Sequence, residues 1–214
     1  KCPLYRFSHQ DGHVRAASRF TELCEAKRFI SLHFSGGTTE VLLYENGKLI
    51  IIGGTKDISF GQLLDRIGTK LGLAFPCGEE LDNIAYEYLT KNIKPKILVF
   101  PKIKINSGYI NLSGIESAVF RFIDGKTLEI DEKNQLILGI FSSISTAILD
   151  MLDEVYKKYA INDFLFAGGV SSSKTLRKMI GEAGTNFNYV FCEHELSSDN
   201  AIGISLLGGE KIWR

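Results

Sequence analysis

The stretch "RFISLHFSGGTTEVLLYENGKLIIIGGT", residues 28–55, decides the fold class, because it reads as three β-strands joined by two tight turns. The turn "ENGK" lies between two apolar runs, and Asn-Gly in that setting is a strong signal for a two-residue hairpin turn. The Gly36–Gly37 pair marks the other turn. The segment therefore predicts an antiparallel meander of three strands.

Helices and strands alternate in the rest of the chain. Ahead of the meander, residues 3–8 read as a short strand and residues 9–28 as a helix. After it, helices are expected over 57–73 and 79–92, broken by the turn "AFPCG", and over 132–159, where apolar residues share one side.

The last third of the chain continues this alternation. Residues 96–123 look irregular and strand-like, running toward a helix. A buried strand "DFLFAGGV", a helix "SSKTLRKMIGEAG", a strand "YVFCEH" and a terminal helix beginning at "SSDNA" follow. The whole pattern predicts an α/β protein.

The composition is that of an ordinary globular protein. Of 214 residues, 44% are hydrophobic and 23% charged, and the formal net charge is +0. A nucleic-acid partner would therefore need a local basic patch or another subunit. Apolar runs such as "LIII" are too short to span a bilayer. The four cysteines form no C-x-x-C pair, which favours a reduced, intracellular and thus cytoplasmic setting.

Histidine and aspartate residues are the candidate metal ligands. His9 and His13 are four residues apart, so on a helix they would share a face and could hold a divalent metal, although a surface pair is the simpler interpretation. Asp199 opens the terminal helix, either as an N-cap or as an oxygen ligand. His33, inside a strand, and His194, in a charged stretch, read as structural.

Two Gly-Gly pairs are candidate anion sites. In "FSGGTTE", Gly36 and Gly37 lack Cβ atoms, so their backbone could approach a phosphate, with Thr38 as a hydroxyl donor. In "FAGGVSSSKTLR", Gly168 and Gly169 lie between a buried strand and a helix start, where anions or ribose hydroxyls bind well. Each pair also reads as an ordinary turn. The chain has no G-x-G-x-x-G fingerprint and no Walker lysine loop.

The order of the motifs resembles the TsaD family of tRNA threonylcarbamoyladenosine synthases, formerly described as O-sialoglycoprotein endopeptidases (the glycoprotease family). "SHQDGH" resembles the family's metal motif, "FSGGTTE" its S-G-G-H-T hairpin, and "AGGVSSSKTLR" its G-G-V-S-A-N-R-x-L-R turn. "GTKDISFGQLLDRIGTKLGLAFPCG" resembles G-x-T-x-D-D-A-x-G-E-A-x-D-K followed by L-G-L-x-Y-P-G-G. "INLSGIESAV" resembles F-S-F-S-G-L-K-T-A, and "SSDNAIGIS" resembles T-D-N-A-A-M-I-A. On six motifs in register, the chain is identified as a member of this family.

The resemblance implies an actin/Hsp70/sugar-kinase-like (ASKHA) ATPase fold, an α/β architecture with a mixed sheet and flanking helices. Residues 29–214 would form a complete C-terminal lobe. Residues 1–28 would be a remnant of the N-terminal lobe carrying the metal-binding helix. The rest of that lobe, including a Gly-rich first hairpin, has no counterpart in the sequence.

The resemblance also implies an activity, namely transfer of threonylcarbamoyl from its adenylate to an adenosine beside the tRNA anticodon. Iron or zinc would be held by His9, His13 and Asp199, with no residue assigned as a catalytic acid or base. The adenylate or ATP-type nucleotide would be held by Ser35, Gly36, Gly37, Thr38, Asp65, Gly78, Gly168, Gly169 and Ser173. The implied partners are tRNA, accessory proteins of the threonylcarbamoylation system and a homo- or heterodimer partner, without a membrane.

The chain departs from the family pattern around the implied nucleotide site, at Thr38, Gln62, Arg66, Cys77 and Ser173. These differences indicate a divergent paralogue. They leave open two alternatives, a carbamoyltransferase with a non-tRNA acceptor and a non-catalytic partner of an active homologue. Metalloprotease activity is not expected, because Gln10 stands where a zinc protease needs glutamate after its first histidine.

Overall fold

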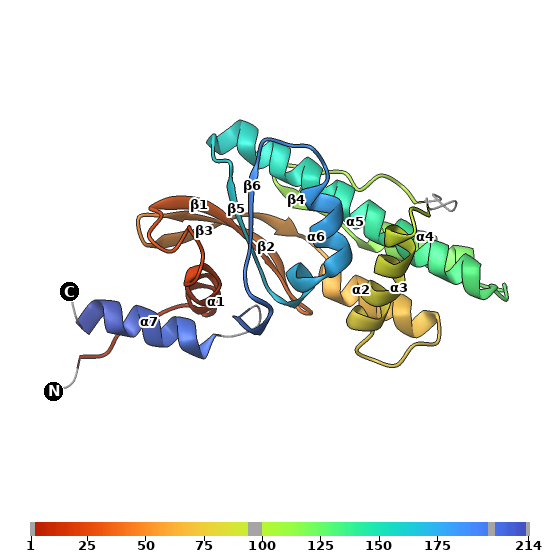
Figure 1. Ribbon diagram of the computed structural model, residues 1–214, viewed down its shortest axis with the longest axis horizontal. Coiled ribbons are helices and arrows are strands. Elements are labelled where there is room, and N and C mark those ends of the chain that lie inside the picture. Colours follow the sequence, from red (N-terminus) through yellow and green to blue (C-terminus); the bar gives the residue numbers. More distant parts are fainter. Residues whose placement is uncertain (1–2, 94–99, 197–199, 213–214) are drawn as a thin grey trace.

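The predicted meander forms half of the sheet (Figure 1). Strands β1 (Arg28–Phe34), β2 (Thr39–Glu45) and β3 (Lys48–Thr55) are antiparallel neighbours, as the sequence predicts. Between β2 and β3, Asn46 and Gly47 have φ angles of 49° and 80°. Positive φ at both central residues is what a type I′ hairpin turn requires, and Asn-Gly adopts it readily.

The computed structural model describes residues 3–93, 100–196 and 200–212. Its sheet has six strands in the order β4-β3-β2-β1-β5-β6. Strands β4 (Tyr109–Ile110), β5 (Asp163–Ala167) and β6 (Asn188–Phe191) each run parallel to a neighbour, so the sheet is mixed. Because β1 and β5 are adjacent and parallel, the two Gly-Gly turns that follow them lie at the same edge of the sheet.

The helices are α1 (His9–Ser18), α2 (Phe60–Lys70), α3 (Gly78–Thr90), α4 (Ser113–Ile123), α5 (Ile130–Tyr159), α6 (Lys174–Gly181) and α7 (Ala201–Ile212), with 3₁₀ turns η1 (Gly169–Ser172) and η2 (His194–Leu196). They cover both faces of the sheet (Figure 1). Residues Ile30, Leu32 and Phe34 of β1 belong to a large apolar cluster with α2 to α6. On the opposite face, Phe29 belongs to a smaller cluster with α1, as strand alternation requires.

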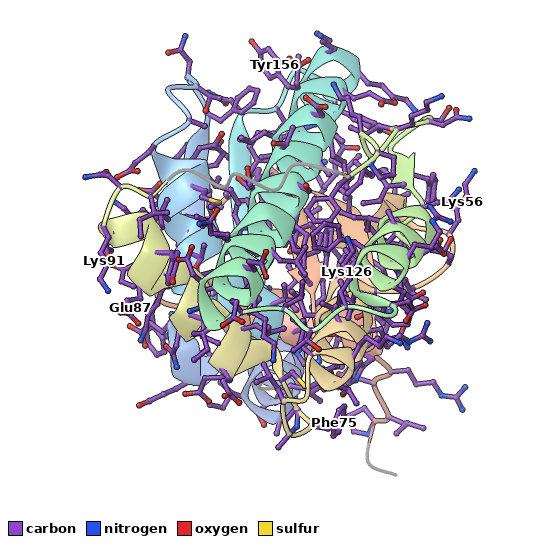
Figure 2. All side chains as sticks on the ribbon, turned by 90° about the vertical axis from the view of Figure 1, so that its right-hand side faces the viewer. Lys56, Phe75, Glu87, Lys91, Lys126 and Tyr156 are labelled. Atoms are coloured by element: carbon purple, nitrogen blue, oxygen red, sulfur yellow. The ribbon has the colours of Figure 1, made fainter. Side chains whose placement is uncertain are left out.

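Helix α5 is the core helix of the large cluster and crosses the middle of the view in Figure 2. Its length and hydropathy would allow a membrane span by composition alone. However, Leu136, Ile140, Ile144, Ile148 and Leu152 are at most 1% exposed and pack in the core. This burial is typical of the central helix of a soluble protein.

The N-terminal segment differs from the prediction. Residues 3–8 form no strand, and Ser8 instead begins α1 through a capping box with Asp11, whose carboxylate accepts from the Ser8 backbone N–H at 2.7 Å. The helix predicted over 9–28 ends at Ser18, where the chain turns and the Ser18 carbonyl accepts from the N–H of Thr21 at 3.1 Å and from its hydroxyl at 2.9 Å. Helix α1 packs on β1 and β5 and against α7, and the division into 1–28 and 29–214 stays a prediction.

Candidate functional site

Five of the predicted nucleotide-binding residues line a single cavity of about 340 Å³: Gly36, Asp65, Gly78, Gly169 and Ser173. They come from the turn after β1, from α2, from the start of α3 and from the segment after β5. A cavity of this size is within the range of small-molecule sites, roughly 300–1,000 Å³. The fold therefore joins motifs that are far apart in the sequence. The other four predicted residues do not line it: Ser35, Gly37, Thr38 and Gly168.

The turn after β1 is closed by its own hydrogen bonds. The Ser35 hydroxyl accepts from the backbone N–H groups of Gly37 at 3.3 Å and Thr38 at 3.0 Å. It also lies 2.8 Å from the Thr38 hydroxyl. These groups point back into the turn, which leaves Gly36 as the residue presented to the cavity. The predicted contact of Thr38 with a phosphate stays a prediction.

Two glycines allow the backbone segments around the cavity to touch. A Cβ at Gly61 would lie 2.4 Å from Gly36 Cα, so only glycine lets α2 begin directly beside the turn. The Ser59 hydroxyl donates to the Gly36 carbonyl at 2.7 Å and fixes this approach. Gly168 has φ +88°, and a Cβ there would lie 2.4 Å from the Phe34 carbonyl oxygen. Gly168 therefore supports the site without facing the cavity.

Replacing Gly61 with alanine should lower the free energy of unfolding by about 1–2 kcal/mol, since the backbone clash outweighs alanine's higher helix propensity. Urea unfolding measures the change. Gly114→Ala is the matched control. Gly114 also lies in the first turn of a helix, but a Cβ at this position would have no neighbouring atom within 4 Å. Equal unfolding midpoints for the two variants would contradict the predicted clash.

A buried carboxylate, Asp82, closes the α6 end of the cavity. It is 8% exposed and accepts from the Ser173 hydroxyl at 2.5 Å, the Lys174 N–H at 2.8 Å and the Thr175 N–H at 3.0 Å. The Ser173 hydroxyl in turn caps α6 by accepting from the Leu176 N–H at 3.1 Å. The positive end of α6 is thus already neutralised by an anion.

Asp82 was not predicted from the sequence as a site residue. Its one signal is an acid on the inner face of the predicted helix 79–92, beside the buried residues Leu81 and Ala85. Asp65, by contrast, is both predicted and placed at the cavity. Its Oδ1 accepts from the Cys77 N–H at 2.8 Å, which ties α2 to the turn before α3.

The two histidines of α1 converge. Their Nε2 atoms are 3.0 Å apart, at hydrogen-bond distance, with the donor set by the tautomers of the two rings, and the rings meet edge to face at 86°. With metal–nitrogen bonds of about 2.0–2.1 Å, this separation corresponds to an angle of roughly 95° at a shared metal. His9 is exposed and His13 is 8% exposed, so the pair opens to solvent on one side. The geometry fits two imidazole ligands of a divalent metal.

A third histidine lies beneath the pair. The His33 ring stacks on His13 with centroids 4.7 Å apart and an interplanar angle of 27°. It is 3% exposed, and its Nδ1 makes no hydrogen bond to any described residue. Burial, with smaller effects from His13 and His9, lowers the pKa of His33 to about 4. The ring is therefore neutral at pH 7. From the sequence, His33 was expected to be a structural residue only.

Helix α7 is preceded by Asn200, which contacts the histidine helix. The Asn200 side chain donates to the His9 carbonyl at 2.6 Å. A Cβ at Gly203 would lie 1.8 Å from the Gly12 carbonyl oxygen, so the two helices touch through their backbones. Asp199, which precedes Asn200, lies outside the described residues. Within residues 3–93, 100–196 and 200–212, no three His, Cys, Asp or Glu side chains are arranged to hold a metal.

The sequence matches one protein family over most of its length. The model for the family "TsaD: tRNA N6-adenosine threonylcarbamoyltransferase" matches residues 1–206. The chain is 29% identical over 213 residues to the tRNA N6-adenosine threonylcarbamoyltransferase of Streptococcus thermophilus, and 33% identical over 221 residues to that of Fervidobacterium nodosum. These matches cover 95% and 99% of this chain but 60% and 64% of the relatives, so the chain spans about three fifths of their length.

Solved structures share the fold at low sequence identity. HypF of T. kodakarensis has a TM-score of 0.70 at 13% identity, covering 96% of this chain and 37% of that one. Component A of the Acidaminococcus fermentans (R)-2-hydroxyglutaryl-CoA dehydratase has a TM-score of 0.59 at 18% identity, and the match covers 97% of this chain and 70% of that one. The predicted ASKHA-type fold is thereby confirmed. Because the family model accounts for residues 1–206, the chain belongs to the TsaD family, the tRNA N6-adenosine threonylcarbamoyltransferases.

Proposed function

We propose that this chain is the substrate- and metal-binding part of a transferase that moves threonylcarbamoyl from its adenylate to an adenosine beside the tRNA anticodon. The observation that carries the proposal is the cavity in which Gly36, Asp65, Gly78, Gly169 and Ser173 meet. These residues belong to three family motifs, and because they line one cavity, a single ligand could contact all of them. The activity itself would belong to the complete protein.

The adenylate would lie in this cavity with its phosphate near the turn after β1. A Cβ at Gly36 would have no neighbouring atom within 4 Å, so the space beside this residue is open and a phosphate oxygen could approach its backbone. The start of α6 is unsuited to a phosphate, because the Asp82 carboxylate already occupies the N–H groups of Lys174 and Thr175. That end would instead take the nucleoside, with Asp65 accepting from a ribose hydroxyl.

His9 and His13 would hold a divalent metal, either iron or zinc, and Asp199 would add an oxygen ligand. The 3.0 Å separation of the two Nε2 atoms supports this pairing. When bound, the metal would supply Lewis-acid polarisation of the carbamoyl group. The turn after β1 would connect the two parts of the site, since His33 stacks on His13 and Gly36, which lines the cavity, follows three residues later.

The partners follow from the reaction. The tRNA would be the acceptor. Because the formal net charge is +0, the chain itself would attract a polyanion weakly, which supports recruitment of tRNA with the help of accessory proteins. The assembly would be a homo- or heterodimer. The buried core position of α5 supports a soluble protein, and a tRNA acceptor would place the reaction in the cytoplasm.

The test separates metal binding from transfer. Elemental analysis of the protein purified without chelators should give near-stoichiometric iron or zinc, and a His9→Ala/His13→Ala variant should lose it. Gln10→Ala, which lies between the two histidines, should keep it. The complete protein, supplied with its adenylate and tRNA, should form threonylcarbamoyladenosine, and the double variant should form at least 100-fold less, about the loss expected when an essential metal is removed. A metal-loaded complete protein that modifies no tRNA would refute the proposed function.

A further inference from the structure

We propose that His33 is a positioning residue, whose ring fixes the orientation of the His13 imidazole so that its Nε2 faces His9. This inference rests on the metal site of the proposed function. His33 comes from β1 rather than from the histidine helix, and it contacts the inner of the two predicted ligands.

The His13 ring needs such support because its plane is not set by the helix. The χ2 torsion of histidine is broad, so the backbone of α1 alone does not select a ring orientation. His9 contacts only the edge of the ring, through the Nε2 atoms that a bound metal would separate, whereas His33 covers its face at 27°. A face contact restricts rotation about χ2, since turning the ring would drive its edge into the partner.

His33 is itself held firmly. Strand β1 is paired on both sides, and the register places His33 opposite Glu40 of β2 and Ala167 of β5. A residue in the middle of a sheet moves little, so it offers a fixed surface for a ligand ring. Residues behind metal ligands set ligand orientation in this way, and their loss typically weakens metal binding by about 10–100-fold.

The chemistry of the position also points to a role. His33 lies on the sheet face whose other buried members include Phe29, Leu165 and Ala167. Its Nδ1 is buried without a hydrogen bond to the described part of the chain, which costs stability relative to an apolar side chain of similar size. Among the described residues, the stack on His13 is the one ring contact that this imidazole makes.

The first measurement is Zn²⁺ affinity of the full chain, by competition with a chromophoric chelator. His33→Leu should bind Zn²⁺ about 10-fold more weakly than the parent, whereas His33→Phe, which keeps a flat ring, should stay within about threefold. Ser31→Ala is the control, because Ser31 is also buried in β1, two residues away, and is replaced by a smaller side chain. Equal affinity of His33→Leu and parent would overturn the proposal. So would an equal loss in both His33 variants, because the nitrogen would then matter rather than the stack.

The second measurement needs no metal. In imidazole ¹H–¹³C NMR spectra of the metal-free chain, the His13 signals should be sharp in the parent and in His33→Phe, and broadened by exchange in His33→Leu. Unchanged His13 signals in His33→Leu would overturn the proposal. A parent that binds no Zn²⁺ yet shows the broadening would refute the proposed metal site and leave the positioning role supported.

Discussion

Replacing Gly203 with alanine should push α7 away from α1 and lower the free energy of unfolding by about 3 kcal/mol. The new Cβ would lie 1.8 Å from the Gly12 carbonyl oxygen and 2.6 Å from its carbonyl carbon. Both are backbone atoms, which cannot rotate aside as a side chain can. Urea unfolding measures the loss, and limited proteolysis should show earlier cleavage at α7.

The same helix provides the control for this prediction. Gly208 also lies in α7, but a Cβ there would meet no atom within 4 Å. Gly208→Ala should therefore leave stability unchanged or raise it by up to about 1 kcal/mol through helix propensity. If Gly203→Ala were as stable as Gly208→Ala, the close backbone contact between α1 and α7 would be wrong.

Replacing Asp82 with alanine should lower the free energy of unfolding by about 3 kcal/mol, because a buried carboxylate that accepts several hydrogen bonds is lost. The N–H groups of Lys174 and Thr175 would lose their acceptor, and the Ser173 hydroxyl would lose its partner. Thermal and urea unfolding measure the effect. Asp82→Asn keeps one acceptor oxygen and should lose less.

Glu79→Ala is the matched control for Asp82→Ala. Glu79 lines the same cavity and its removal changes the charge equally, but its side chain is exposed. A surface substitution of this kind should change stability by no more than about 0.5 kcal/mol. Similar losses for the two variants would mean that the cavity's overall charge, and not the cap on α6, sets the stability.

Local signals in the sequence were sufficient for most of the elements. The meander was predictable because strand alternation and an Asn-Gly turn depend on neighbouring residues only. The long helix α5 was predictable because its apolar residues recur at the spacing of one helix face. The end of α1 was not predictable in the same way. Residues 19–27 keep a helical composition, yet they form turns, in which the Ser18 carbonyl accepts from both the N–H and the hydroxyl of Thr21.

The site was only partly predictable, because its geometry depends on contacts between distant residues. The two Gly-Gly turns meet because β1 pairs with β5, joining Ile30 to Phe164. The cap on α6 joins Asp82 to Ser173, 91 residues later. Likewise, the stack of His33 on His13 requires α1 to lie across β1. No periodicity or motif spacing encodes such pairings, so Asp82 and His33 were not assigned to the site.

The contact between α1 and α7 also sets an order of events during protein synthesis. The hydrogen bond from Asn200 to His9 joins residues 191 positions apart. At a ribosomal rate of about 5–20 residues per second, roughly 10–40 s separate the synthesis of these two residues. The meander can fold on the nascent chain, since its contacts are local. The histidine helix has no α7 to dock against until translation has passed Gly203, so a chain truncated before that point would lack one wall of the histidine site.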